Sequence, residues 1–199
     1  MNETYHHGNL RNDLIAAGLT MLCRDGFAGF SLRKLSQELG VSHAAAYRHF
    51  RNREELLGAI VAESSRMFRE TLATAVSPGA GGREALLALG SSYVHFFLKN
   101  PEILTLFLLL RSEHNLMGLL FSGDPGNRSF PDRNAFEIFR SIAITARDLP
   151  AYRDLSEREL LLGFWSKVHG LATILVSHHE FLKDEDLEAA IGRIIATPF

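Results

Sequence analysis

Residues 31–53 read SLRKLSQELGVSHAAAYRHFRNR and contain two short helical patterns joined by a tight turn. The first begins at Ser31, whose hydroxyl can accept a hydrogen bond from a helix start, and it repeats leucine on one face. Gly40 stands where helices commonly end in a left-handed residue. The second helix, from His43 to about Phe50, is thin enough to enter the major groove of DNA, about 12 Å wide. The stretch therefore predicts a helix-turn-helix.

Composition is typical of an ordinary soluble protein with a substantial core. The chain has 199 residues, of which 46% are hydrophobic and 22% are charged. Its single cysteine, Cys23, cannot form an internal disulfide, and the sequence has neither a signal-like start nor about 20 consecutive apolar residues. We therefore expect a cytoplasmic protein that does not associate with membranes.

Charge is distributed unevenly along the chain. Residues 1–53 hold seven Lys and Arg against four Asp and Glu, a net charge of +3, whereas the whole chain has a net charge of −2. Five of those seven cations lie in residues 31–53, where they could displace counterions from a polyanion. The charge pattern therefore indicates that the first quarter of the chain faces nucleic acid.

Helical periodicity continues along the rest of the chain, with no convincing alternating strand. The linker SPGAGG at 77–82 is the clearest break, and a turn-rich loop is expected at 122–132. We predict an all-α fold of about nine helices, with a DNA-binding domain at 1–53 and a ligand-binding and dimerisation domain at 54–199. The expected helices cover residues 9–26, 31–39, 43–50, 54–76, 83–99, 102–114, 134–148, 157–179 and 185–196.

Several stretches resemble the DNA-binding head of TetR-family transcriptional regulators: GF at 26–27, SLRKLS at 31–36, LGVS at 39–42 and YRHFRNREELL at 47–57. The run WSKVHG at 165–170 is similar to the Trp-His-Gly signature of one C-terminal subgroup of that family. The resemblance implies an all-α homodimer with a three-helix head, a connecting fourth helix and a regulatory body. It also implies a roughly palindromic double-stranded DNA operator and repression relieved by a small molecule.

The family's DNA-contacting positions correspond to residues on both short helices and at the start of the next helix. Arg48 or Arg33 could pair with guanine, while Tyr47 and His49 could reach phosphates. Ala46 stands where the family usually has a larger apolar residue, which makes base preference hard to infer. The residues predicted to contact DNA are Ser31, Arg33, Ser42, His43, Ala44, Ala45, Tyr47, Arg48, His49 and Arg53.

The helix expected at 157–179 is apolar on more than one face, which predicts burial on two sides. One side would face its own subunit and the other a partner subunit, although both sides could also pack within one chain. Gly163 and Gly170 could allow close approach of helices. The residues predicted at the dimer interface are Phe164, Val168, Leu171, Leu175, Ile191 and Ile194.

Aromatic residues are concentrated on helices that the family arranges around an internal cavity. Such walls suit a small apolar or aromatic effector, although aromatic residues at helical spacing also form plain core. His169 could orient a ligand or could be a hydrogen-bonded structural histidine. The residues predicted to line the pocket are Met67, Tyr93, Phe97, Phe107, Phe136, Phe139, Trp165 and His169.

Two other functions remain as alternatives. The run His178, His179 and Glu180 could suggest a metal-dependent enzyme, but adjacent residues on a helix point about 100° apart, and the sequence has no HExxH, CxxC, GxSxG or phosphate-binding glycine loop. The second alternative is a helical ligand-binding or protein-docking module that does not bind DNA. We expect no catalytic residue, metal site or cofactor, and we predict a DNA-binding repressor.

Overall fold

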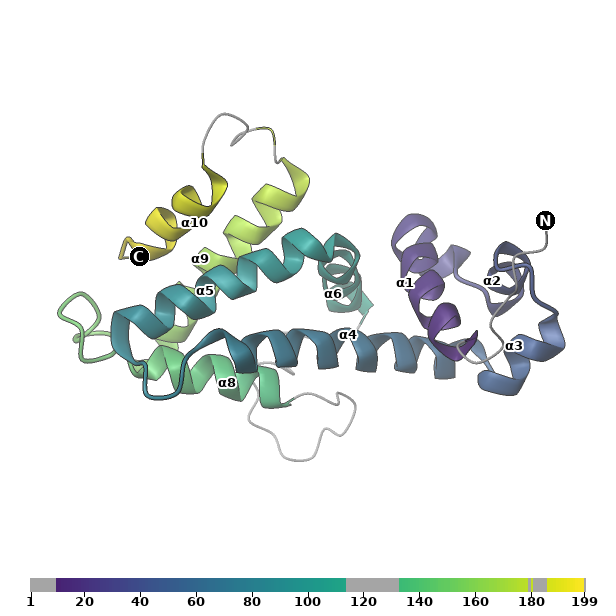
Figure 1. The fold of residues 1–199 in the computed structure, drawn as a ribbon, viewed down its shortest axis with the longest axis horizontal. Helices are drawn as coiled ribbons and strands as arrows, with labels where there is room; N and C mark the ends of the chain where they lie inside the picture. Colours follow the sequence, from purple (N-terminus) through teal and green to yellow (C-terminus); the bar gives the residue numbers. More distant parts are fainter. Residues whose placement is uncertain (1–9, 114–132, 179, 181–185, 199) are drawn as a thin grey trace.

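Helices account for the fold throughout the part of the chain that the computed structural model describes, residues 10–113, 133–178, 180 and 186–198. Figure 1 shows a head formed by the first three helices, a long α4 that leaves the head, and a body built from the remaining helices. The helices are α1 (Leu10–Gly29), α2 (Leu32–Glu38), α3 (His43–His49), α4 (Arg53–Ala75), α5 (Gly82–Lys99), α6 (Pro101–Glu113), α8 (Arg133–Ile144), α9 (Glu157–Ser177) and α10 (Leu187–Ala196). The predicted all-α class is confirmed.

Several helix ends differ from the sequence prediction. Gly26 has a φ of 66°, as expected at a helix end, yet a further helical turn follows it and extends α1 to Gly29. The helix predicted to reach residue 148 ends at Ile144, because the next segment forms turns with bonds such as Ala146 N–H to Ala143 O, 3.1 Å. The loop predicted at 122–132 lies outside the described residues.

The turn between α2 and α3 has the hydrogen bonds of a Schellman motif. Gly40, with a φ of 64°, donates its N–H to the Gln37 carbonyl at 3.1 Å, and Val41 donates to the Ser36 carbonyl at 3.0 Å. Ser42 then begins α3, and its hydroxyl accepts the Ala45 N–H at 3.2 Å. These local bonds satisfy both ends of the turn and fix where the second helix begins.

Two hydrophobic cores meet along α4. The head core includes Leu56 and Ile60 from the first half of α4, and also Leu106 from α6. The body core includes Leu72 from the second half of the same helix. One continuous helix therefore contributes side chains to both cores.

Helix α5 is the centre of the body, since it packs against α4, α6, α8, α9 and α10. Its residue Gly90 lies where α9 and α10 approach it most closely. A Cβ at that position would lie 2.8 Å from Ile195 Cγ2 and 3.2 Å from Val168 Cγ1. The missing side chain therefore allows three helices to pack together.

We expect Gly90→Ala to lower the free energy of unfolding by about 1–3 kcal/mol, because the added methyl group overpacks this junction. Gly58→Ala is the matched control on α4, since a Cβ at Gly58 meets nothing within 4 Å. That change is expected to raise stability by up to about 1 kcal/mol through helix propensity. Urea unfolding followed by circular dichroism measures both, and equal stabilities for the two variants would contradict the packing role of Gly90.

Candidate nucleic-acid interface and aromatic core

Helix α3 presents its polar residues to solvent. His43, Ala44, Arg48 and His49 are exposed, and the Tyr47 side chain is 49% exposed although it is a large aromatic residue. An exposed tyrosine beside an exposed arginine provides a donor, a cation and an aromatic face on the same short helix. This surface can contact phosphates and base edges.

The opposite side of α3 packs into the head. Ala46 is fully buried and belongs to the head core, and Ala45 is half-buried against it. The resemblance implies a larger apolar residue at position 46. Because Ala46 is buried, its small size affects the packing beneath α3 and leaves the outer surface of the helix unchanged. Ala45 is the member of the predicted α3 set that lies nearest the interior.

The predicted contacts outside α3 lie in mixed environments. Arg33 and Ser42 are exposed, whereas Ser31 is half-buried and its hydroxyl accepts the Lys34 N–H at 3.5 Å. Arg53, at the start of α4, is half-buried, and its guanidinium carbon lies 5.8 Å from the centroid of the Phe30 ring. The Arg53 side chain thus already contacts the head core.

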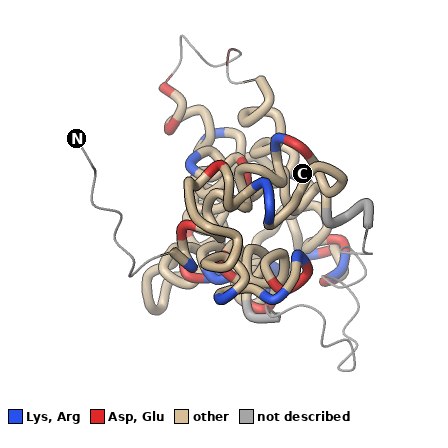
Figure 2. The backbone as a smooth tube through the Cα atoms, turned by 90° about the vertical axis from the view of Figure 1, so that its right-hand side faces the viewer, with Lys and Arg blue, Asp and Glu red and all other residues tan. Residues whose placement is uncertain are grey.

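Positive charge is not uniform over the head. Basic and acidic residues are interspersed on the end of the molecule that faces the viewer in Figure 2. Arg24 is paired with Asp25 at 2.8 Å and with Glu38 at 2.7 Å, and its guanidinium holds the pKa of the Asp25 carboxyl below its ordinary value. Arg24 is therefore already neutralised by carboxylates, in contrast to the exposed Arg48.

The aromatic residues predicted in the body come together around α5. Tyr93 lies 5.1 Å from Phe97 and 6.4 Å from Phe139, and Phe97 lies 5.9 Å from Phe107, as measured between ring centroids. Trp165 is stacked on His169 at 4.8 Å. Met67 and Phe136 are partly buried against the same core.

Phe68 is at the centre of this aromatic core, although it was absent from the predicted pocket. Its ring centroid lies 5.4 Å from Tyr93, 5.4 Å from Phe97 and 6.0 Å from Phe107. The sequence contained only a weak signal for this role, namely an aromatic residue beside Met67 on an amphipathic helix. Phe68 links α4 directly to the aromatic residues of α5 and α6.

A polar cluster lies inside these aromatic walls. The buried Tyr93 hydroxyl is 3.0 Å from His169 Nδ1, and it also has a hydrogen bond with Trp165. The indole N–H can only donate, so Tyr93 Oη accepts it, and the same hydroxyl is hydrogen-bonded to His169 Nδ1. Burial raises the pKa of Tyr93 well above its ordinary value, which keeps this hydroxyl protonated. His169 is therefore part of a hydrogen-bonded cluster inside the aromatic core.

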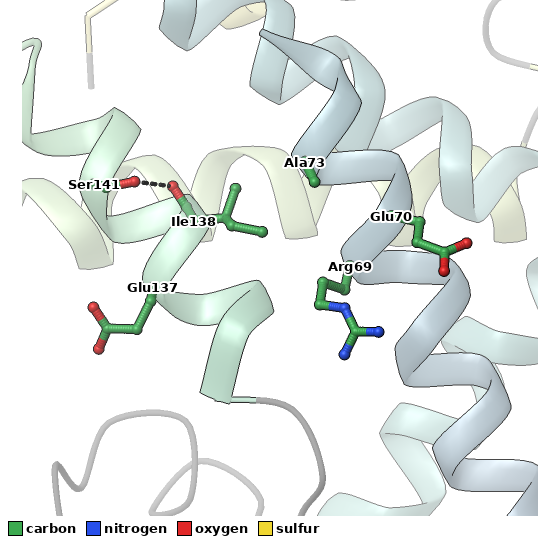
Figure 3. A pocket seen from close by; sticks show the side chains of 6 residues that line it. All are labelled: Arg69, Glu70, Ala73, Glu137, Ile138 and Ser141. Atoms are coloured by element: carbon green, nitrogen blue, oxygen red, sulfur yellow. Dashed lines mark hydrogen bonds between the residues drawn. The ribbon is translucent and has the colours of Figure 1, made fainter.

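A hollow of about 520 Å³ opens between α4 and α8 (Figure 3), at a different place from the predicted pocket. In Figure 3, Ile138 points toward α4, whereas Glu70 and Glu137 point away from the gap between the two helices. The residues that line it are Arg69, Glu70, Ala73, Glu137, Ile138 and Ser141. None of the eight predicted pocket residues is among them.

The predicted dimer interface needs correction at four positions. Phe164, Val168, Leu175 and Ile191 are buried in the core of their own subunit, so their side chains are not available to a partner. The prediction selected apolar faces of α9 and α10 that turn inward toward α5.

Other apolar residues face outward on α9 and α10. Leu162 is 36% exposed, Ile174 is 52% exposed, and Ile194, one of the predicted interface residues, is 39% exposed. Leu171, also predicted, is half-buried beside the core. A Cβ at Gly170 would meet nothing within 4 Å, so the outer side of α9 is open there.

Within the described residues, no group of three or more His, Cys, Asp or Glu could hold a metal ion. His178 Nδ1 lies 3.4 Å from Glu180, whereas His169 is engaged with Tyr93 and Trp165. His179 lies outside the described residues. The neighbouring histidines in the sequence thus do not form a described metal-ligand cluster with His169.

Helix α9 is long and apolar enough to cross a membrane by length and composition alone, and 39% of its apolar window is buried inside the subunit. Its inward face carries core residues such as Leu160 and Phe164. These residues are part of a packed helical body, and the composition of α9 alone is weak evidence for a membrane span.

Residues 14–60 match the family model of bacterial regulatory proteins of the tetR family. This match covers most of α1, all of α2 and α3, and the first third of α4. It therefore includes the whole helix-turn-helix whose geometry is described above.

Solved structures of similar fold extend over almost the whole chain. The TetR-family transcriptional regulator PfmR from Thermus thermophilus is 19% identical, with a TM-score of 0.67 and coverage of 100% of this chain and 98% of its own. A bacterial regulatory protein in the tetR family from Rhodococcus RHA1 is 15% identical, with a TM-score of 0.66 and coverage of 97% and 96%. A protein of unknown function from Rhodococcus sp. RHA1 is 27% identical, with a TM-score of 0.60 and coverage of 98% and 97%.

Proposed function

We propose that the chain is a TetR-family transcriptional regulator that binds DNA, and that it acts as a homodimeric repressor released from its operator by a small apolar or aromatic effector. The observation that carries this proposal is the exposed face of α3, where Tyr47 and Arg48 lie above a buried Ala46. We propose that residues 1–53 form the DNA-binding domain and that residues 54–199 form the regulatory domain. The protein would act in the cytoplasm, where its operator is found, and we propose no catalytic role.

In this proposal the exposed side of α3 enters the major groove. Arg48 can donate two hydrogen bonds to a guanine, and Tyr47 and His49 can donate to phosphates. Arg33 and the amide groups at the start of α2 would hold the head in register on the DNA backbone. Phosphate contacts of this kind supply affinity, whereas the few base contacts supply sequence preference.

Dimerisation is supported by the apolar surface that one subunit leaves exposed. Less than half of the apolar window of α9 is buried in the subunit, and Leu162 and Ile174 face outward from it. Ile194 adds an exposed apolar side chain on α10. We propose that these residues, with Leu171, pair with the same face of a second copy, because an isologous contact is self-complementary. Gly170 would let the paired helices approach closely.

An effector of apolar or aromatic character suits the aromatic core. Phe97, Phe107 and Phe139 would provide apolar walls, and Tyr93 with His169 would provide the polar groups that orient a ligand. Phe68 lies among these rings on α4, so a ligand that displaces it would move that helix. We propose this core as the effector site in place of the open hollow between α4 and α8.

The proposed release mechanism depends on the spacing of the two heads. Recognition helices of a dimer contact successive major grooves only when they are about 34–36 Å apart, or a multiple of that distance. A shift of α4 in the effector-bound body would move each head through the core residues Leu56 and Ile60. Affinity would then fall although no residue at the DNA surface changes.

A second candidate function is a helical ligand-binding or docking module without DNA binding. The feature that favours this second function is Ala46, because its small side chain gives α3 only a small contact with the head core. Selection of genomic DNA fragments on the purified protein discriminates between the two functions, because such a module would enrich no DNA sequence.

We expect Tyr47→Ala and Arg48→Ala each to weaken operator binding by about 1–3 kcal/mol, roughly five- to 150-fold, because each removes a contact at the groove. The operator is first obtained by that selection, and affinity is then measured by fluorescence anisotropy. Arg24→Ala is the matched control, since Arg24 is already paired with Asp25 and Glu38, and its affinity should stay near the wild-type value. Unchanged affinity in both α3 variants would reject the proposed DNA contacts.

We expect Ile174→Glu to convert the dimer into a monomer, because it places a charge in an apolar interface where it cannot be solvated. Sedimentation equilibrium at micromolar concentration measures the mass. Leu108→Glu is the control, because Leu108 is a 41% exposed apolar residue on α6, away from the proposed interface. A wild-type monomer, or a dimer that persists in Ile174→Glu, would count against this face.

Trp165 is the single tryptophan of the chain, so its fluorescence reports on the aromatic core. We expect an apolar effector to change Trp165 emission, to weaken operator binding and to stabilise the fold by about 2.7 kcal/mol at one hundred times its Kd. A panel of aromatic and aliphatic compounds can be tested in all three measurements. A compound that stabilises the protein and changes Trp165 emission but leaves DNA affinity unaltered would contradict the proposed coupling.

A further inference from the structure

Two arginines cover two buried aromatic rings of the head. The guanidinium carbon of Arg11 lies 5.3 Å from the centroid of Phe50, and that of Arg53 lies 5.8 Å from the centroid of Phe30. Both rings are only 1% exposed. Distances under about 6 Å are those of cation–π contacts, in which the positive charge is attracted to the face of the ring.

Phe50 is the residue that ends α3. It is the C-cap of that helix, and its N–H donates to the Ala46 carbonyl at 3.1 Å. Helix α3 has only seven residues, which is shorter than the length at which an isolated helix is stable, so tertiary contacts at its ends determine its orientation. The ring of Phe50 is such a contact, because it anchors the end of α3 in the head core.

Helix α1, which carries Arg11, packs against α4. The charge of Arg11 adds to the effect of Arg66, whose hydrogen bond is the main reason that the pKa of Glu63 lies below its ordinary value. Arg66 in turn binds Glu63 at 2.6 Å and Glu70 at 2.7 Å along the surface of α4. Arg11, in the first turn of α1, thus lies over the residue that ends α3, on a helix that packs against α4.

This place is distinct from the proposed DNA contacts, which lie on α2, α3 and the first residue of α4. Arg11 is an exposed cation in the head, and such a residue could in principle serve DNA either by contacting phosphate directly or by holding another helix in position. The ring beneath its guanidinium favours the second role, because it already gives the charge a specific location in the protein.

We propose that Arg11 is a positioning residue for DNA recognition, which acts by covering Phe50 and so holds α3 in a fixed orientation relative to α4. The inference rests on the proposed DNA contacts of α3. Loss of the Arg11 charge leaves the ring and the helix in place but allows the end of α3 to move. Specific binding then weakens more than nonspecific binding, because base contacts require a defined orientation and phosphate attraction does not.

The test compares Arg11→Gln with Arg33→Ala, the control for a proposed backbone contact, on a duplex that the wild-type protein has selected from genomic fragments and on a scrambled duplex. We expect Arg11→Gln to weaken binding to the selected duplex about two- to fivefold, the range of an exposed cation–π contact, with little change on the scrambled duplex. The dependence of log affinity on log salt should keep its wild-type slope. For Arg33→Ala the slope should fall by about 0.9, as expected when one phosphate contact is lost.

A double-mutant cycle with Phe50→Leu identifies the ring as the route of the effect. Arg11→Gln should have no further effect on affinity in the Phe50→Leu background, provided that circular dichroism shows that variant to be folded. If Phe50→Leu does not fold, the positioning role of Arg11 is tested by the salt dependence and by the comparison of the two duplexes.

Each of the following results would overturn the inference. A reduced salt slope for Arg11→Gln, with equal losses on both duplexes, would make Arg11 a phosphate contact. Unchanged affinity would remove it from DNA recognition, and a lower melting temperature with unchanged affinity would leave it a purely structural role. If the wild-type protein selects no duplex at all, the proposed DNA contacts fail first, and this inference fails with them.

Discussion

The structure depends on the burial of apolar side chains from both halves of α4. Near its start, Leu56 and Ile60 pack into the head, and farther along, Leu72 packs into the body, so the two cores cannot move independently of this helix. A helix of 23 residues is roughly 35 Å long and bends little over that length. The head and the body are therefore joined through one packed helix, and the control of DNA binding that we propose depends on this connection.

The short length of α3 imposes a second constraint. Seven residues do not form a stable helix alone, so α3 relies on the Ser42 cap at its start and on the buried Ala46 and Phe50 beneath it. The outer face of α3 consequently does not pack against the rest of the head. That division explains how Tyr47 can be half-exposed on a helix that is otherwise held firmly by the head core.

The body combines an aromatic core with an apolar outer face. The rings of Phe68 and Tyr93 pack α4 against α5, and the Tyr93 hydroxyl is hydrogen-bonded to His169 Nδ1 within that core. On the other side of α9, Leu162 and Ile174 remain uncovered by their own subunit. The same helix thus contributes to the interior of one subunit and, in our proposal, to the contact between two.

Local chemistry in the sequence determined the helix-turn-helix, because Ser31, Gly40 and Ser42 act through hydrogen bonds to residues three to five positions away. Periodicity likewise identified the all-α class and the aromatic residues of the body. Only the tertiary structure decided which face of α9 is internal, since a helix that is apolar on several sides has no sequence signal for the inward one. The central place of Phe68 and the contact of Arg11 with Phe50 were decided there too, because such contacts join residues far apart in sequence and arise only when whole helices pack.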